Sequence, residues 1–127
     1  MVSDLTVLSL ESNQLTKSIP TSLGRLSRLN WLMLYDNHLT GEVPTEIGML
    51  GNLTWLRLEK NNNIRGTLPT ELGALSSLEH ATFHGTALSG TVPGDFCTLI
   101  AAEQLLVGIE CDEVSCDCGC MCYNSFI

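Results

Sequence analysis

Residues 29–52 read LNWLMLYDNHLTGEVPTEIGMLGN, and residues 53–58, LTWLRL, begin the same pattern again. The chain has four prolines, and they keep a spacing of 24 or 25 residues: Pro20, Pro44, Pro69 and Pro93. A fixed period of this length indicates a solenoid, in which each repeat packs only against its neighbours. We therefore expect a single domain built from stacked repeats.

Each repeat begins with three apolar residues in the spacing L-x-x-L-x-L, seen first as Leu5, Leu8 and Leu10. In an extended strand alternate side chains face opposite sides, so Leu8 and Leu10 share one face while Val7 and Ser9 share the other. One repeat cannot bury its leucines alone. Parallel stacking at about 4.8 Å pairs the strands and joins the leucines into a continuous core.

Other repeated positions have structural explanations. Asn13, Asn37 and Asn61 each follow the last leucine of a trio by three residues. A buried Asn at a fixed turn can satisfy backbone groups that the turn leaves without partners. Proline fixes φ on the outer side, where no ladder N–H is needed. We therefore do not nominate the motif residues themselves as functional.

Each repeat closes with a Leu-Gly-x-Leu element, as in Leu23-Gly24-Arg25-Leu26. The whole pattern resembles the 24-residue plant-type leucine-rich repeat of receptor-like kinase ectodomains and polygalacturonase-inhibiting proteins, from residue 2 to about residue 114. It departs from the family at Lys17 and Cys97, where Gly is usual, and at Thr86, where Asn is usual. The resemblance implies an α/β fold, a right-handed solenoid (a horseshoe segment) with a parallel concave sheet, and a signalling or defence context.

We assign residues 1–104 to the repeats, starting mid-repeat with four full copies, and residues 105–127 to a terminal strand and a cysteine-rich C-terminal cap. Val2 aligns with the last leucine of a repeat, so we expect that upstream repeats or an N-terminal cap are missing. A fifth strand is threaded from Leu106 to Cys111. This threading places Gly108 beside His80 and Val114 in the Asn column.

All six cysteines lie near the C-terminal end: Cys97, Cys111, Cys116, Cys118, Cys120 and Cys122. They are disulfide candidates in an oxidising compartment, and the sequence does not select among the possible pairings. A Cys97–Cys111 bridge is our expectation, because the threading places both in the last packed layer. The alternative is a thiolate metal cluster, although zinc sites ordinarily use paired C-x2-4-C elements.

Charge and hydropathy exclude several classes of partner. The net charge is −8, and residues 78–127 carry seven acidic residues and no basic one. Nucleic acids and anionic membranes both require a basic face. The longest apolar stretch, from Phe96 to Ile109, is too short to insert across a bilayer. Asn52-Leu53-Thr54 is an N-glycosylation sequon, with Asn52 as acceptor, which favours an extracellular location.

The variable strand positions form columns on the concave face. Two adjacent exposed tryptophans are unexpected unless a ligand covers them, and Trp, Tyr and Arg are frequent interface anchors. A stabilising cross-strand Trp pair is the structural alternative. His80 and His84 are about 13 Å apart along one strand, too far to chelate one metal ion. The candidate ligand-binding residues are Trp31, Met33, Tyr35, Trp55, Arg57, Glu59, His80 and His84.

No catalytic motif is present, and no cofactor or metal is required by the pattern. The sequence therefore predicts a non-enzymatic module that recognises a protein, a peptide or a glycan on its concave face, in a secreted protein or the ectodomain of a receptor-like membrane protein. Two alternatives stay open. The repeats could form a cell-surface spacer without a dedicated ligand, or the cysteine-rich cap could bind metal.

Overall fold

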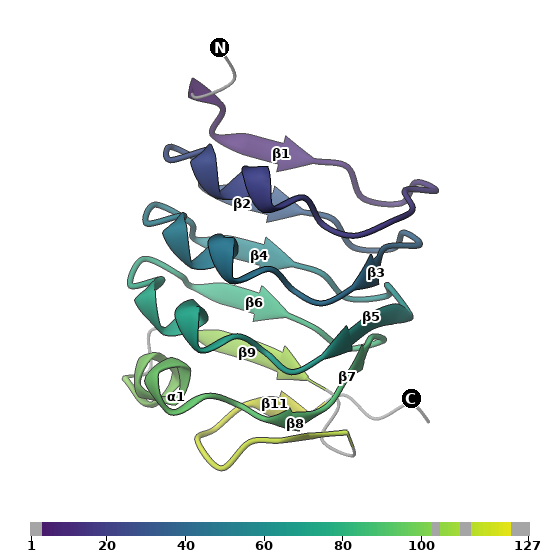
Figure 1. Cartoon of the computed structure of the whole chain (residues 1–127). Helices are drawn as coiled ribbons and strands as arrows, with labels where there is room; N and C mark the ends of the chain where they lie inside the picture. Colours follow the sequence, from purple (N-terminus) through teal and green to yellow (C-terminus); the bar gives the residue numbers. More distant parts are fainter. Residues whose placement is uncertain (1–3, 103–104, 110–112, 123–127) are drawn as a thin grey trace.

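The chain folds as a stack of parallel turns, with strands on one side and short helices on the other (Figure 1). The computed structural model describes residues 4–102, 105–109 and 113–122. In these ranges one parallel sheet runs the length of the stack. Its strands, in spatial order, are β1 (Val7–Ser9), β2 (Trp31–Met33), β4 (Trp55–Arg57), β6 (His80–Thr82), β9 (Leu106–Ile109) and β11 (Met121–Cys122).

The opposite side carries a helical turn in each repeat. Every one begins directly after a repeat proline, whose backbone is extended and whose carbonyl accepts the first helical hydrogen bond, as Pro44 does from the Ile47 N–H at 3.1 Å. The proline therefore sets the start of each turn without losing a needed donor. The turns are the 3-10 helices η2 (Thr21–Arg25), η3 (Thr45–Met49) and η4 (Thr70–Ala74), followed by the α-helix α1 (Gly94–Ala101).

Short strands connect the two sides of the stack. A three-stranded parallel sheet joins β3 (Thr40–Gly41), β5 (Asn63–Gly66) and β7 (Ala87–Leu88). A smaller pair joins β8 (Gly90–Thr91) and β10 (Val114–Ser115). No helix in the described parts of the chain has the length and apolar character needed to cross a membrane.

The predicted leucine columns form the core. Leu32 and Leu56 are fully buried and lie opposite each other in the sheet register. The first repeat is different, because Leu8 is only partly buried and Leu10 is 39% exposed. A leucine layer is fully buried when a repeat packs on each side of it. Among the described strands, β1 has a neighbour on one side only, so its leucines keep exposed area.

The asparagine column satisfies turn backbone groups, as the sequence predicts. Asn61 is fully buried; its Nδ2 donates to the carbonyls of Leu34 at 3.0 Å and Leu58 at 2.9 Å, while its Oδ1 accepts from the Leu39 N–H at 3.1 Å. Asn37 makes the equivalent bonds one repeat earlier. Each Asn therefore links two successive turns.

The threading of the fifth strand is wrong by two residues. His80 lies opposite Leu106, not Gly108, and Gly108 pairs with Thr82. Val114 pairs with Gly90, so it occupies the Gly column and not the Asn column. The last helix is eight residues long where the earlier ones have five, which changes the length of chain before the strand.

Candidate functional site: the concave face

A ladder of ring side chains crosses the centre of the sheet. Trp31, Trp55 and His80 are register partners on β2, β4 and β6. The ring centroids of Trp31 and Trp55 are 6.0 Å apart, and those of Trp55 and His80 are 4.0 Å apart. Trp31 is 45% exposed, while Trp55 and His80 are half-buried. The expected placement of both tryptophans outside the core is confirmed.

Aliphatic residues extend this ladder at both ends. Val7 on β1 pairs with Trp31, and Leu106 on β9 pairs with His80. Their exposed fractions are 42% and 53%. Because the whole column is apolar or aromatic and retains exposed area, it offers a continuous strip that a ligand could cover.

A second cluster lies beside the ladder. The Arg57 guanidinium carbon is 4.0 Å from the ring centroid of Tyr35, a cation–π arrangement. The Arg57 Nε donates to Glu59 Oε1 at 2.7 Å, and Arg57 Nη2 also forms an ion pair with that oxygen. Thr82 donates to the other carboxylate oxygen. The Tyr35 ring and the Glu59 carboxylate orient Arg57, and the Thr82 hydroxyl in turn orients Glu59.

The eight candidate residues do not share the same exposure. Glu59 is 1% exposed and Met33 is 8% exposed, so both lie beneath the surface and support their neighbours. Tyr35, Arg57 and His84 are half-buried. His80 stacks on Trp55, whereas His84 accepts at its carbonyl from the Lys60 N–H at 2.9 Å.

The face carries a further acidic side chain, Glu11, and an open hollow. The Ser9 hydroxyl donates to the Glu11 carboxylate, which lowers the pKa of Glu11 below its usual range and keeps it anionic. An open hollow of about 800 Å³ lies where the strands β4, β6 and β9 begin. It is lined by Thr54, Ser76, Ser77, Leu78, Glu79, His80 and Leu106.

The sequon residue Asn52 is exposed just before β4. Its Nδ2 donates to the Ser27 carbonyl at 2.9 Å, and its own carbonyl accepts from Asn30 Nδ2 at 3.0 Å. Glycosylation at Asn52 stays a prediction.

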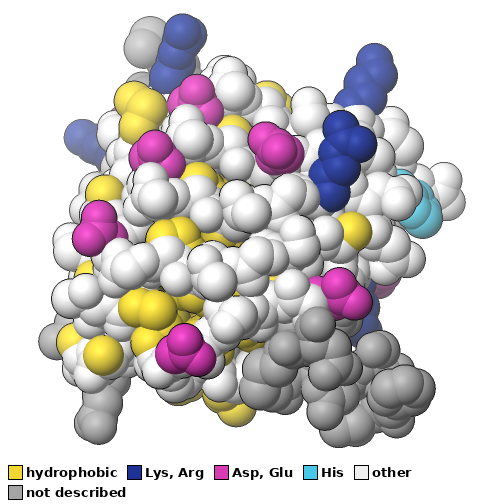
Figure 2. Space-filling view, turned by 60° about the horizontal axis from the view of Figure 1, so that its bottom comes forward, with side chains coloured by type: hydrophobic (Ala, Val, Ile, Leu, Met, Phe, Trp, Pro, Cys, Tyr) yellow, Lys and Arg dark blue, Asp and Glu magenta, His cyan; other side chains and the backbone are white. Residues whose placement is uncertain are grey.

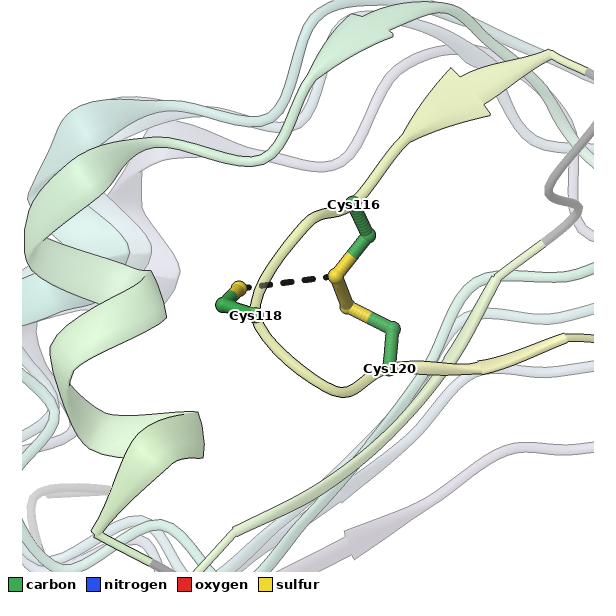
Figure 3. A group of neighbouring side chains, drawn as sticks. All are labelled: Cys116, Cys118 and Cys120. Atoms are coloured by element: carbon green, nitrogen blue, oxygen red, sulfur yellow. Dashed lines mark hydrogen bonds between the residues drawn. A yellow bond between two sulfur atoms is a disulfide. The ribbon is translucent and has the colours of Figure 1, made fainter.

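The capped end is cross-linked, but not as expected. Cys97 on α1 bonds to Cys118, and Cys116 bonds to Cys120 (Figure 3 draws the second bridge). The predicted Cys97–Cys111 bridge is therefore wrong. That prediction followed from the incorrect threading, since Ile109 and not Cys111 ends the last buried trio. Cys111 and the side chain of Cys122 lie outside the described residues.

Comparison with known proteins supports the repeat assignment. The family model for the leucine-rich repeat matches residues 3–64. A search of curated proteins finds no match. Among solved structures, the plant peptide hormone receptor RGFR1 in complex with RGF2 is 38% identical with a TM-score of 0.81, over 90% of this chain and 18% of that chain.

Two receptors from Arabidopsis are also similar. The ectodomain of the membrane receptor kinase GASSHO1/SCHENGEN3, in complex with CASPARIAN STRIP INTEGRITY FACTOR 2, is 30% identical with a TM-score of 0.78, over 95% of this chain and 15% of that chain. The ectodomain of the receptor kinase HAESA, in complex with an extended IDA peptide hormone, is 29% identical with a TM-score of 0.74, over 88% and 18%.

The chain spans less than a fifth of the length of these three receptors. Repeat period, leucine core, asparagine column and structural likeness agree, and the chain belongs to the leucine-rich-repeat proteins, with repeats similar to those of plant receptor-kinase ectodomains.

Proposed function

We propose that this protein is a non-enzymatic recognition module, and that it binds a peptide or protein segment along the concave face outside the cell. The observation that carries the proposal is the partly exposed ladder of Trp31, Trp55 and His80, which continues across three strands. The buried core forms without these rings, because neither tryptophan belongs to it.

The chemistry of the face favours a peptide with an apolar stretch. Val7 and Leu106 lengthen the apolar strip, and the fixed Arg57 guanidinium beside it can donate to a ligand carbonyl or carboxylate. The bound peptides of similar receptors support this class of ligand. A glycan ligand, which could stack on the same rings, is the second candidate.

A binding experiment on surface variants tests the proposal. The immobilised protein is panned against a displayed library of random peptides, and selected peptides are measured by calorimetry. Truncating a central aromatic anchor costs about 2 kcal/mol or more at an interface. We expect Trp31→Ala combined with Trp55→Ala to weaken binding at least about tenfold, with urea unfolding little changed.

Met49 provides the matched control. It is 63% exposed on η3, on the opposite side of the solenoid, so Met49→Ala removes exposed apolar area without touching the concave face. Met49→Ala is expected to bind as the parent does. Selected peptides that bind the double Trp variant equally well would contradict the proposal. Lost stability without lost binding would favour the spacer alternative.

The extracellular location is tested by expression through the secretory pathway. The proposal predicts a glycosidase-sensitive mobility shift that Asn52→Gln abolishes. Absence of any such shift in secreted protein would remove the sequon as support for this location.

A further inference from the structure

Four cysteine sulfurs gather at the capped end of the solenoid. Cys97 comes from α1, and Cys116, Cys118 and Cys120 come from the loop between β10 and β11. The Sγ atoms of the three loop cysteines all lie within 4.8 Å of one another, and the Sγ of Cys116 is 3.4 Å from that of Cys118 (Figure 3). The two disulfides are therefore in contact with each other and do not cross-link separate places in the cap.

The four sulfurs form one compact group that could surround a metal ion once the disulfides are reduced. Zinc binds four thiolates tetrahedrally at about 2.3 Å, which puts neighbouring sulfurs about 3.8 Å apart. Between the two bridges, the Cys116 and Cys118 sulfurs are 3.4 Å apart, near that spacing, whereas the sulfurs within each bridge are bonded and would have to separate. Once the two S–S bonds open, small side-chain rotations would suffice to place four ligands around one ion.

The surroundings favour a cation. Residues 78–127 carry no lysine or arginine, so no basic side chain of this region competes for the thiolates. Figure 2, where the capped end comes forward, shows Asp and Glu spread over the view and most Lys and Arg along its upper and outer edges. The four cysteines are half-buried and pack against the core, which limits solvent access to an ion held there.

We propose that the reduced cap binds one zinc ion through Cys97, Cys116, Cys118 and Cys120, so that the same residues close the solenoid by two disulfides when oxidised and by a metal when reduced. A dithiol supplies two electrons and two protons to each S–S bond and becomes a disulfide itself. Zinc then displaces the four thiol protons as the Zn–S bonds form. This site is independent of the concave face.

Cobalt titration tests the site, because Co²⁺ reports tetrahedral thiolate ligation by its visible and near-ultraviolet bands. The parent for the test carries Cys111→Ser and Cys122→Ser, so that only the four clustered cysteines remain. It is reduced with a dithiol, which is then removed without oxygen. We expect one Co²⁺ per chain, displaced by one Zn²⁺, and a higher urea midpoint with Zn²⁺ present.

Cys97→Ser is the decisive variant, because it separates a folded site from loose thiols in the loop. Loss of this ligand should weaken Zn²⁺ binding at least about tenfold and shift the Co²⁺ bands, whereas the neighbouring Ser115→Ala should do neither. The proposal is overturned by substoichiometric binding, or by equal affinity in Cys97→Ser. It is also overturned if Zn²⁺ leaves the urea midpoint of the reduced protein unchanged.

Discussion

At the residue scale, Lys17 shows the cost of departing from the repeat pattern. It has φ +68°, whereas the equivalent residues of the next two repeats are glycines, Gly41 and Gly66, at +78° and +86°. A left-handed backbone costs a non-glycine residue about 1–2 kcal/mol, and glycine avoids this cost but loses more entropy on folding.

Lys17→Gly is therefore expected to raise the free energy of unfolding by up to about 1 kcal/mol, measured by urea denaturation. Ser18→Gly is the control, because Ser18 lacks a positive φ and should only lose stability. Equal destabilisation by both substitutions would show that Lys17 is not strained.

Asn61 and Asn13 offer a second matched pair. Asn61→Ala removes the Asn61 side chain's bonds to the buried Leu58 carbonyl and Leu39 N–H, whereas the Leu34 carbonyl keeps Asn37 Nδ2 as a donor, so the free energy of unfolding should fall by about 3 kcal/mol. Asn13 makes similar bonds but is exposed, so water can replace it and Asn13→Ala should cost less than about 1 kcal/mol. Similar losses in chemical denaturation would contradict this account.

Residue identity alone was enough to place some side chains and not others. The two tryptophans could be assigned to the concave face because strand alternation fixes which side each faces. The burial of Glu59 could not be predicted, since it depends on Arg57 and on Thr82 one strand away, and sequence pattern does not report such cross-strand contacts.

At the element scale, each 3-10 turn packs so closely against the next helix that it requires a glycine, at Gly24, Gly48 and Gly73. A Cβ on Gly48, in η3, would lie 2.5 Å from the carbonyl oxygen of Glu71 in the first turn of η4. Gly48→Ala should therefore cost about 1–3 kcal/mol by overpacking. Gly51 has no atom within 4 Å of an added Cβ, so Gly51→Ala is the control and should be close to neutral. Thermal unfolding of the two variants distinguishes them.

The fifth strand explains why the register could not be read from sequence. A shift of two residues keeps every side chain on its own face, so Val107 with Ile109 and Ile109 with Cys111 satisfy the alternation equally well. Only the length of α1 decides between them, and no motif encodes it. The disulfide pairing failed for the same reason, because the shifted threading placed Cys111 in the last packed layer.

At the scale of the whole molecule, stability should vary along the stack. The N–H groups of Leu10, Leu34 and Leu58 make the same hydrogen bond in successive strands, at 2.9, 2.9 and 3.0 Å. Leu58 is fully buried while Leu10 is 39% exposed. In solenoids each layer is stabilised by its neighbours, so outer layers open more easily.

Hydrogen exchange should therefore show protection that rises from Leu10 to Leu34 to Leu58, measured by NMR under native conditions. Because the three amides make the same hydrogen bond, a difference in their exchange protection reports the position of the layer and not the bond itself. Uniform protection along the stack would mean that the solenoid opens only as one cooperative unit.

The glycines of the three 3-10 turns, Gly24, Gly48 and Gly73, have a consequence for how repeats could be added to such a protein. In the last helix, α1, Cys97 takes the equivalent sequence position and is bonded to Cys118. A duplicated segment could be inserted between existing turns, because each already presents the smallest residue to its neighbour. A repeat added after α1 would have to pack against the Cys97–Cys118 disulfide, so this one cysteine limits where further repeats can be inserted.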